Sequence, residues 1–400
     1  MSKLEQLIKE LCPNGVEWKT VEEIFNLKNG YTPSKANKEY WENGTVPWFR
    51  MEDLRTNGNI LNDAVQHIHT SGVRGKLFPA NSIIMATTAT IGEHALITVD
   101  YMSNQRFTNF ALRDDICELI DTKFAYYYFF ILDEKAKQAV NTSSFPSVQM
   151  EQLKKWDFPL PPLPVQEEIV RILDNFTELT AELTAELTAE LTARKKQYEY
   201  YRNSLLSESE LCTDGVEYRK LEKCCNILDR QRKPVTKSAR ETGEYPYYGA
   251  NGIQDYVSDY IFDGTFVLVG EDGSVITKNG NPVVTWAQGK IWVNNHAHII
   301  GEIDGVLLRY LYHFIQTVDV TSLIHGNIPK LTGGDFKTIP IPIPPLKEQE
   351  RIVAILDKFD ALTTSINEGL PAEIEARKQQ YEYYRDNLLN FEKIDTEVLI

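Results

Sequence analysis

Three adjacent polar residues, Asn104-Gln105-Arg106, have side chains of the kind that reads DNA bases. Asn and Gln form bidentate hydrogen bonds to adenine edges, and Arg forms them to guanine edges. In the same half, the turn with Thr87 and Thr88 has small polar side chains that a phosphate could approach closely, and Lys28 adds a cation. These residues predict nucleic-acid contacts. The alternative is a polar loop that only stays solvated.

The second half of the chain contains a comparable set of candidates. Its densest basic stretch includes cations that could contact phosphates: Arg230, Arg232, Lys233 and Lys237. Other candidates lie in aromatic or polar loops: Tyr248, Asn251, Asn294, Asn295, His296, Asn327 and Lys330. A charge run that is merely solvated is again the alternative. The set predicts a second surface that contacts nucleic acid.

His296 and His298 could instead indicate a metal-dependent nuclease. In a strand they would point to one side, but the sequence shows no evident carboxylate partner for a metal site. The chain also lacks a P-loop, a Gly-rich cofactor turn, the Asn-Pro-Pro-aromatic motif of amino-methyltransferases and a G-x-S-x-G elbow. We therefore expect no catalytic residue, no metal and no cofactor held by this chain.

The composition limits the class of protein. The 400 residues allow two to three domains, and 42% hydrophobic residues suffice for real cores. A net charge of −15 argues against strong DNA binding by the chain alone and suggests that partner subunits supply much of any phosphate contact. The five cysteines lack the paired spacing of zinc sites, which favours reduced thiols in the cytoplasm. The longest apolar run, Phe124–Leu132, is too short to span a membrane, and no signal peptide is predicted.

Two mixed α/β regions must position the candidate side chains. Short apolar runs between turn signals predict strands at 82–85, 94–99 and 107–112, and residues 121–140 predict a helix. In the second half, 265–269 and 282–286 predict buried strands, and residues 1–10 predict a short amphipathic helix. The proline-rich segments Phe158–Val165 and Pro340–Pro345 predict extended straps that end the two regions.

A long helix is predicted from Val165 to Leu206, a stretch without Gly or Pro. Its apolar residues recur every three or four positions, and ~40 helical residues would span ~60 Å. Its centre, residues 180–191, repeats Thr-Ala-Glu-Leu three times. The spacer candidates begin and end these repeats: Thr180, Leu183, Thr184, Leu187, Thr188 and Leu191. The apolar stripe advances there by four residues each time, so an ideal left-handed supercoil is not expected.

The strap and the long helix occur twice. Phe158–Leu206 aligns with Ile341–Leu389 without a gap (341 − 158 = 183), and more than half of the aligned residues are identical. A weaker match relates Leu11-Cys12 to Leu211-Cys212 (211 − 11 = 200). Gly369 and Pro371 should end or kink the second helix. The duplication divides the chain into a globular region at 1–157, a helical spacer at 158–206, a globular region at 207–340 and a second helical region at 341–400.

In this order the motifs resemble the specificity (S) subunits of type I restriction-modification systems, the HsdS family, over essentially the full length. The resemblance rests on Pro-Pro-Leu-x-x-Gln-Glu-x-Ile-Val at 161–170 and its copy at 344–353, on Val46-Pro47-Trp48, on Tyr-Gly-Ala-Asn-Gly at 248–252 and on Ile-Pro-Lys-Leu at 328–331. It implies an α+β fold with an internal pseudo-two-fold duplication. Two α/β target-recognition domains would be separated by two long antiparallel, coiled-coil-like helices.

The resemblance also implies a non-catalytic subunit of a DNA adenine methyltransferase and restriction complex in the bacterial or archaeal cytoplasm. Each domain would read one half of an asymmetric, bipartite site in double-stranded DNA. The helices would dock two modification (methyltransferase) subunits, which hold S-adenosylmethionine and flip the target adenine out of the duplex. Restriction subunits would add the ATP-dependent motor and the Mg-dependent nuclease.

We further hypothesise that the Thr-Ala-Glu-Leu repeats set the gap between the half-sites. One repeat adds ~6 Å of rise and rotates the following chain by roughly 40° beyond a full turn. One base pair rotates DNA by roughly 35°. One repeat would therefore correspond to about one base pair of gap. The alternative to a DNA-specificity subunit as a whole is a coiled-coil scaffold protein whose β domains bind protein.

Overall fold

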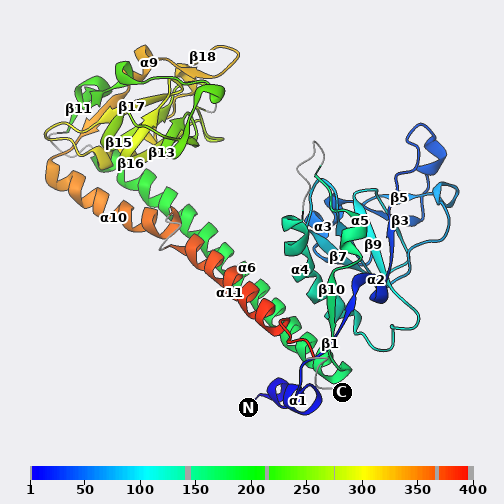
Figure 1. The fold of residues 1–400 in the computed structure, drawn as a ribbon. Coiled ribbons are helices and arrows are strands. Elements are labelled where there is room, and N and C mark those ends of the chain that lie inside the picture. The colour runs from blue at the N-terminus through cyan, green and yellow to red at the C-terminus, as the bar shows by residue number, and fades with distance from the viewer. Residues whose placement is uncertain (1, 140–145, 212–215, 274, 365–368, 395–400) are drawn as a thin grey trace. The chain divides into compact units, whose positions relative to one another are not determined.

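The structure is a computed structural model, and it describes residues 2–139, 146–211, 216–273, 275–364 and 369–394. The chain forms two compact units. Unit 1 comprises Met1–Leu183 and Ala376–Ile400, and unit 2 comprises Thr184–Glu375. Each unit therefore combines a globular domain with parts of both long helical regions (Figure 1).

The globular part of unit 1 is built on a five-stranded sheet. Its strand order is β2 (Phe25–Asn29), β9 (Phe107–Leu112), β6 (Ser82–Ala86), β7 (His94–Ile97) and β4 (Ile60–Leu61). All neighbours are antiparallel except β7 and β4. A three-stranded sheet contains β5 (His67–Ile68), β3 (Val46–Phe49) and β8 (Met102–Ser103). The strands predicted at 82–85, 94–99 and 107–112 are confirmed, the second one ending two residues early.

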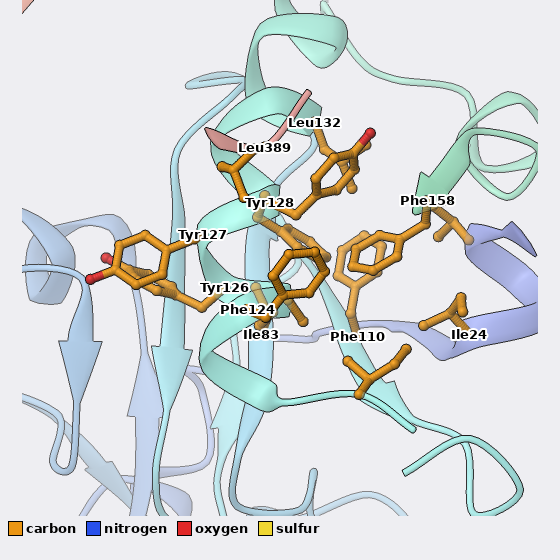
Figure 2. Close-up of a cluster of buried hydrophobic side chains, with 14 of the residues drawn as sticks. Ile24, Ile83, Phe110, Phe124, Tyr126, Tyr127, Tyr128, Leu132, Phe158 and Leu389 are labelled. Carbon is orange, nitrogen blue, oxygen red and sulfur yellow. The ribbon is translucent and has the colours of Figure 1, made fainter. Parts of the chain in front are cut away.

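Helix α4 (Thr122–Gln138) confirms the helix predicted at 121–140 and supplies much of the core of unit 1. Phe25 of β2 lies edge-on to three rings, those of Phe110, Phe129 and Phe158, with centroids 5.5 to 5.9 Å apart. Figure 2 shows Leu389, which follows the last helix, beside the α4 side chains of this buried cluster. Leu389, far from α4 in sequence, is therefore part of the core of unit 1.

Unit 2 is built on a six-stranded sheet. Its strand order is β12 (Asn226–Ile227), β17 (Ala297–Gly301), β15 (Phe262–Gly270), β16 (Val284–Val293), β13 (Thr242–Gly249) and β14 (Gly252–Val257). Only β16 and β13 are parallel neighbours. Helix α8 (Leu308–Ile315) packs on β15 and β16. The runs predicted as strands at 265–269 and 282–286 lie in β15 and at the start of β16. The first four strands repeat the order β2-β9-β6-β7 of unit 1, so the duplication extends to the sheets.

A two-stranded sheet joins the start and the end of each globular domain. In unit 1, β1 (Glu17–Thr20) pairs with β10 (Asp157–Leu160), and in unit 2, β11 (Glu217–Lys220) pairs with β20 (Pro340–Ile343). The predicted straps are therefore edge strands, where proline is tolerated. The first strap is shorter than predicted, because helix α6 already begins at Leu163 and Pro164 lies in its first turn.

The other elements are short. The helices are α1 (Lys3–Leu11), which confirms the helix predicted at 1–10, α2 (Val21–Ile24), α3 (Met51–Asn57), α5 (Met150–Leu153), α7 (Glu208–Leu211) and α9 (Gly333–Thr338). The remaining strands are β18 (Ile324–His325) and β19 (Lys330–Leu331). The 3-10 helices are η1 (Lys38–Tyr40), η2 (Thr70–Gly72), η3 (Leu221–Lys223), η4 (Asp229–Gln231), η5 (Lys237–Ala239) and η6 (Thr321–Leu323).

The two long helical regions differ as the sequence predicts. Helix α6 is continuous from Leu163 to Leu205 and includes all three repeats. The second region is interrupted, since α10 (Leu346–Thr364) ends before α11 (Leu370–Leu388) begins. Of the repeat residues, Leu187 is buried, Thr180, Leu183, Thr184 and Leu191 are half-buried, and Thr188 is exposed.

The long helices pair in antiparallel fashion within unit 1. The ring of Phe176 on α6 lies 6.0 Å from that of Tyr384 on α11, and the hydroxyls of Thr177 and Tyr381 are hydrogen-bonded at 2.9 Å. Further along α6, Leu183 shares a groove with Arg377. Contacts that advance along α6 thus move backward along α11, which confirms the predicted orientation. Within unit 2, Tyr201 of α6 stacks on Phe359 of α10 with centroids 5.3 Å apart.

A buried glutamine fastens each globular domain to its long helix. The Oε1 of Gln166 accepts a hydrogen bond from the Asp121 N–H (2.8 Å), and its Nε2 donates to the carbonyls of Pro161 (2.6 Å) and Leu119 (2.8 Å). Asp121 is the residue that caps α4. The glutamine therefore fixes the point at which the helix of the domain begins.

The same contact recurs in unit 2. The Oε1 of the buried Gln349 accepts from the Leu307 N–H (2.9 Å), and its Nε2 donates to the carbonyls of Pro344 (2.9 Å) and Gly305 (3.2 Å). Leu307 precedes α8, as Asp121 precedes α4. We call these two arrangements the glutamine clamps.

Eight residues beyond each clamp (174 − 166 and 357 − 349), an aspartate makes a second link to the domain. Asp174 accepts hydrogen bonds from Lys123 (2.6 Å) and the Tyr127 hydroxyl (2.8 Å) of α4. Asp357 accepts them from Arg309 (2.7 Å) and from Nε2 of His313 (2.7 Å) of α8. The geometry is duplicated, but a tyrosine in unit 1 is replaced by a histidine in unit 2.

We expect Gln349→Leu, which keeps the volume of the side chain, to reduce the free energy of unfolding of unit 2 by roughly 1–3 kcal/mol, because buried backbone groups lose their partner. Urea unfolding followed by intrinsic fluorescence measures the change. Glu350→Leu, at the exposed neighbouring position, is the control. Equal effects of the two substitutions would contradict the role of the clamp.

The stability of unit 2 should fall as the pH drops below the ordinary histidine pKa. His313 is fully buried, and burial lowers its pKa from 6.5 although the hydrogen bond to Asp357 opposes this shift. The unfolded chain therefore takes up a proton near pH 6.5 that the folded chain resists. Unfolding midpoints measured from pH 7.5 to 5.5 should fall less steeply in His313→Gln than in the wild type. Parallel curves would show that His313 does not contribute.

Candidate nucleic-acid interface

Residues Asn104-Gln105-Arg106 form a tight turn just before β9. The Asn104 Oδ1 accepts a hydrogen bond from the Arg106 N–H (3.0 Å), so the side chain of the asparagine fixes the turn. The Asn104 N–H donates to the carbonyl of Phe49 in β3 (3.0 Å), and the Arg106 carbonyl accepts from the N–H of Thr87, which follows β6 (3.0 Å). Gly30 fits against this turn because a Cβ there would lie only 2.2 Å from the Asn104 carbonyl oxygen.

Unit 2 contains the same turn before β17. The Asn294 Oδ1 accepts from the His296 N–H (2.8 Å), and the Asn294 N–H donates to the carbonyl of Tyr248 in β13 (3.1 Å). The His296 carbonyl accepts from the N–H of Glu271, which follows β15 (2.8 Å). Side-chain chemistry predicted Asn104 and Arg106 in the first half and, independently, Asn294 and His296 in the second. The structure places the two sets at equivalent positions of the two units. We call residues 104–106 and 294–296 Asn-turn 1 and Asn-turn 2.

A further segment completes the edge of each sheet beside its Asn-turn. The Val148 N–H donates to the Thr87 carbonyl (2.9 Å), and the Leu331 N–H donates to the Glu271 carbonyl (2.8 Å). The neighbouring residues also form equivalent bridges, Thr88 with Ser147 and Asp272 with Lys330. We call residues 87–88, 104–106 and 147–148 turn edge 1. Residues 271–272, 294–296 and 330–331 are turn edge 2.

Turn edge 1 presents amide, guanidinium and hydroxyl groups. Gln105 and Arg106 are exposed, and Thr88 is half-buried. Lys28 is exposed near the end of β2, where Gly30 approaches the same turn. The structure thus brings together the candidates at 87–88 and 104–106, whereas the Lys28 ammonium lies over the Phe78 ring.

Turn edge 2 presents a different set of groups. Asn295 is exposed, and the side chains of His296 and Lys330 are 46% and 45% exposed. The imidazole of His296 is hydrogen-bonded to the carboxylate of Asp272, and the Lys330 ammonium lies 3.3 Å from Glu271. The two edges therefore share one backbone frame and differ in the side chains that they expose.

A hollow of about 570 Å³ lies beside turn edge 2. Three predicted residues line it together, Asn251, His296 and Lys330. Gln254 and Ile328 also line it, together with Ala250, Asp272 and Gly273, and Ile328 is 69% exposed. Asn327, the neighbour of Ile328, is exposed as well. This hollow combines amide groups with an apolar surface, the two kinds of group that distinguish base edges in a major groove.

Four predicted contact residues stabilise the structure instead. Thr87 is buried with its hydroxyl on Thr108 (2.9 Å), and Tyr248 and Asn294 are buried. Arg232 pairs with Glu271 (2.7 Å) and donates to the Ala297 carbonyl (2.6 Å), and its side chain is only 11% exposed. The prediction that these four side chains contact DNA is therefore not supported, because their polar groups are buried or already paired.

The rest of the basic run lies along β13 and β16. The Lys233 N–H donates to the Val293 carbonyl (3.3 Å), and the Trp292 indole N–H donates to the Lys233 carbonyl (2.6 Å). The side chains of Arg230, Lys233 and Lys237 are exposed. These three cations remain available for phosphate contacts near turn edge 2.

The prediction that His296 and His298 lack carboxylate partners is wrong. Besides the pair of His296 and Asp272, the Nδ1 of the buried His298 lies 2.7 Å from Oδ2 of Asp229. Asp229, Glu271 and His298 are close enough together to hold a metal ion. However, Nε2 of His298 is hydrogen-bonded to the Leu331 carbonyl (2.9 Å), and Arg232 neutralises the carboxylates. Burial acts to raise the pKa of Asp229, but the hydrogen bonds from His298 and the Ile299 N–H and the charges of His298 and Arg232 together outweigh burial and lower this pKa.

The same place in unit 1 holds only neutral groups. The Thr108 hydroxyl donates to Oδ1 of Asn29 (2.9 Å) and is hydrogen-bonded to Thr87 (2.9 Å). Asn29, Thr87 and Thr108 correspond to Asp229, Glu271 and His298, since they lie at the same positions of equivalent strands. Both triads tie the strands together beneath a turn edge. The charged version in unit 2 is therefore a structural contact.

Sequence reasoning missed several members of the edges. Ser147 and Asp272 were not singled out as contact candidates, because distant strand pairing brings them to the turns. Gln254 and Ile328, which line the hollow beside turn edge 2, were not singled out as contact candidates either. The Asn three residues before the start of a strand (107 − 104 and 297 − 294) was a usable signal for both turns. Its spacing of 190 residues (294 − 104 = 190) differs from the 183 and 200 of the other repeats, which hid the equivalence.

The described cysteines carry free thiols. Burial raises the pKa of Cys224 to about 11 and that of Cys225 to about 12, which disfavours the reactive thiolate. Cys212 lies outside the described residues. In the part of the chain that the structure describes, no helix combines the length and apolar character needed to cross a membrane.

Comparisons with known proteins agree with this architecture. The family model for the type I restriction modification DNA specificity domain matches twice, at residues 13–193 and 213–376. The type I restriction enzyme EcoprrI specificity subunit of Escherichia coli is 42% identical over 92% of this chain and 93% of its own length. The EcoR124I/EcoR124II specificity subunit of Escherichia coli is 29% identical over 99% of both chains.

Solved structures share the fold. A chain from a structural study of complex assembly and conformational transition of the type I R-M system superposes with a TM-score of 0.60, at 17% identity and over 94% of this chain and 98% of its own. The HsdS subunit from Thermoanaerobacter tengcongensis gives a TM-score of 0.51, at 15% identity and over 95% and 97%.

The duplicated sheets, the paired helices and these matches define a protein class. The chain belongs to the family of type I restriction-modification DNA-specificity subunits. The coiled-coil scaffold with protein-binding domains, considered from the sequence, is thereby set aside. For the nuclease alternative, both ring nitrogens of His298 already have hydrogen-bond partners in the protein.

Chelation should leave the protein unchanged. Because Arg232 already neutralises Asp229 and Glu271, we expect EDTA not to shift the unfolding temperature, and Zn²⁺ titration to show no tight site at these residues. Arg232→Ala should lower the unfolding temperature by several degrees, since it leaves buried carboxylates uncompensated. A Zn²⁺ ion that binds the wild type and is lost in His298→Ala would overturn this assignment.

Proposed function

We propose that this subunit selects a two-part DNA site and that each unit reads one half of it through its turn edge. One observation carries the proposal. Asn-turn 1 and Asn-turn 2 are held by the same three hydrogen bonds, yet they expose different residues. A common frame with different side chains is what the reading of an asymmetric site requires.

The exposed groups suit double-stranded DNA. Arg106 can bind a guanine edge through two hydrogen bonds, and Gln105 can bind an adenine edge in the same way. In unit 2, Asn295 and His296 offer an amide and an imidazole beside the apolar Ile328, which suits a base edge next to a thymine methyl group. The exposed cations Arg230, Lys233 and Lys237 can contact phosphates. Such contacts position the protein on DNA without reading its sequence.

The long helices offer surfaces for partner subunits. In unit 1, Leu179 and Tyr383 are 61% and 66% exposed, and in unit 2, Tyr200 is 69% exposed. Exposed aromatic side chains of this kind are typical anchors of protein interfaces. We assign these surfaces to two modification subunits that carry S-adenosylmethionine and methylate adenine. Restriction subunits with ATP and Mg join the same complex in the bacterial or archaeal cytoplasm, and this chain has no catalytic role.

We also propose that the Thr-Ala-Glu-Leu repeats set the gap between the half-sites. The continuity of α6 through residues 180–191 supports this, since a rigid rod transmits added length and rotation. One repeat turns the chain by roughly 40° beyond a full turn, close to the roughly 35° of one base pair. The net charge of −15 fits a subunit whose partners provide part of the grip on DNA.

Methylation mapping tests the reading of half-sites. Cells that carry this chain with a type I modification subunit should methylate adenine in a two-part motif. Arg106→Ala should relax one position in one half of the motif by roughly 1–3 kcal/mol of discrimination, and His296→Ala should change only the other half. Arg113→Ala is the matched control, because Arg113 flanks the opposite end of β9.

Two outcomes would contradict different parts of the proposal. Changes in the same half for both variants would contradict the assignment of one half to each unit. Methylation that is indifferent to the presence of this chain would overturn the proposed function as a whole.

A further inference from the structure

A second hollow, of about 390 Å³, lies on the three-stranded sheet of unit 1 and is not part of turn edge 1. The rings of Trp41 and Trp48 meet at nearly a right angle, with centroids 5.0 Å apart. Trp48 is 4% exposed and forms the floor, whereas Trp41 is half-buried on the wall. The Trp41 indole N–H donates to the Ser34 carbonyl (3.1 Å), which fixes the orientation of the ring.

A buried carboxylate holds the opposite wall. Asp53 is fully buried, and its two oxygens accept hydrogen bonds from the N–H groups of Arg50 (2.7 Å) and Val65 (2.6 Å). Arg50 and Gln66, the neighbour of Val65, both line the hollow. The Trp48 N–H donates to the Gln66 carbonyl (3.0 Å). The hollow is therefore fixed by the fold and does not depend on a ligand for its shape.

The hollow is basic in a chain that is acidic as a whole. Lys35, Lys38 and Arg50 line it against a single acidic lining residue, Glu42. Arg50 pairs with Glu52 (2.9 Å), but its buried Nε has no hydrogen-bond partner among the described residues. Within the described chain, no ion pair engages Lys35 or Lys38, and both are exposed. An anionic ligand would find uncompensated cations here.

The equivalent place in unit 2 is filled by the chain itself. Tyr247 corresponds to Trp48, since Tyr248 and Phe49 hold the two Asn-turns in the same way. The guanidinium of Arg240 covers the Tyr247 ring at 4.1 Å, and Trp292 stacks on that ring at 6.5 Å. A cation and a planar ring thus occupy the aromatic site in unit 2. In unit 1 the Arg50 guanidinium lies farther from the Trp48 ring, at 5.7 Å, and Trp41, Lys35 and Lys38 remain at least partly exposed around the hollow.

We propose that this hollow binds one nucleotide of a DNA strand, beside the bases that turn edge 1 reads. Lys35, Lys38 and Arg50 contact its phosphate, and its base, turned out of the duplex, stacks on Trp41. The position supports this ligand, because the Trp48 indole N–H donates to the Tyr31 carbonyl (3.0 Å) and the Tyr31 N–H donates to the carbonyl of Ser103, which precedes Asn-turn 1 (2.8 Å). The inference rests on the proposed DNA reading by unit 1, and the contact itself carries no sequence information.

The test measures the affinity of the complete methyltransferase complex for a duplex with its own methylation motif, at several salt concentrations. Trp41→Ala should weaken binding roughly tenfold without changing the salt dependence, and Trp41→Phe should bind like the wild type, since it keeps a stacking surface. Lys38→Ala should reduce the slope of log affinity against log salt by about one, as the loss of one phosphate contact requires. Lys155→Ala, exposed elsewhere on unit 1, is the matched control.

Both variants should leave the methylated motif unchanged. A wild-type complex that reads its two-part motif, with Trp41→Ala and Lys38→Ala binding like Lys155→Ala, would overturn the nucleotide site and leave the proposed function intact. A complex that binds DNA without sequence preference but is still weakened by Trp41→Ala and Lys38→Ala would overturn the proposed function and support the site. Lys38 is exposed, so its variant decides the question even if Trp41→Ala does not fold.

Discussion

Two buried glutamine side chains, Gln166 and Gln349, hold the globular domains to the helices. Each amide accepts a hydrogen bond from the backbone N–H of the residue that precedes a domain helix and donates to two carbonyls of the strap and loop beside it. Such groups are costly to leave unpaired inside a protein, so the position at which α4 or α8 starts is tightly set. The position of the helix in turn sets the position of the sheet that packs on it and of the turn at the edge of that sheet. The clamp therefore links each long helix to a turn edge.

The duplication preserves this frame and changes the groups attached to it. Both units keep the clamp, the aspartate link and the Asn-turn. Thr108 becomes His298 beneath the turn, Tyr127 becomes His313 at the helix, and the exposed pair Gln105-Arg106 becomes Asn295-His296. Conserved backbone contacts with variable side chains allow a subunit to change what it reads without changing how it is built.

The sequence was sufficient for the features that depend on local pattern. The period of α6, the break at Gly369 and Pro371, and the strands around 82–112 follow from spacing and turn residues. Burial of polar side chains could not be read in this way. Arg232 belongs to an obvious basic run, yet Glu271, 39 residues away, removes it from the surface. The carboxylate partners of His298, Asp229 and Glu271, lie 69 and 27 residues away in sequence (298 − 229 and 298 − 271), so only the pairing of strands reveals them. Side-chain chemistry therefore led to the two turns, whereas the burial and pairing of individual side chains are seen only in the structure.

The central claim is that the turn edges fix the bases and the helical spacer fixes the distance between them. Adenine methylation mapped in cells that carry this chain, beside cells in which Thr184–Leu187 is deleted, tests both parts at once. We predict that both half-site sequences stay the same and that the gap between them shortens by about one base pair. An unchanged gap, or altered bases in either half, would contradict the account.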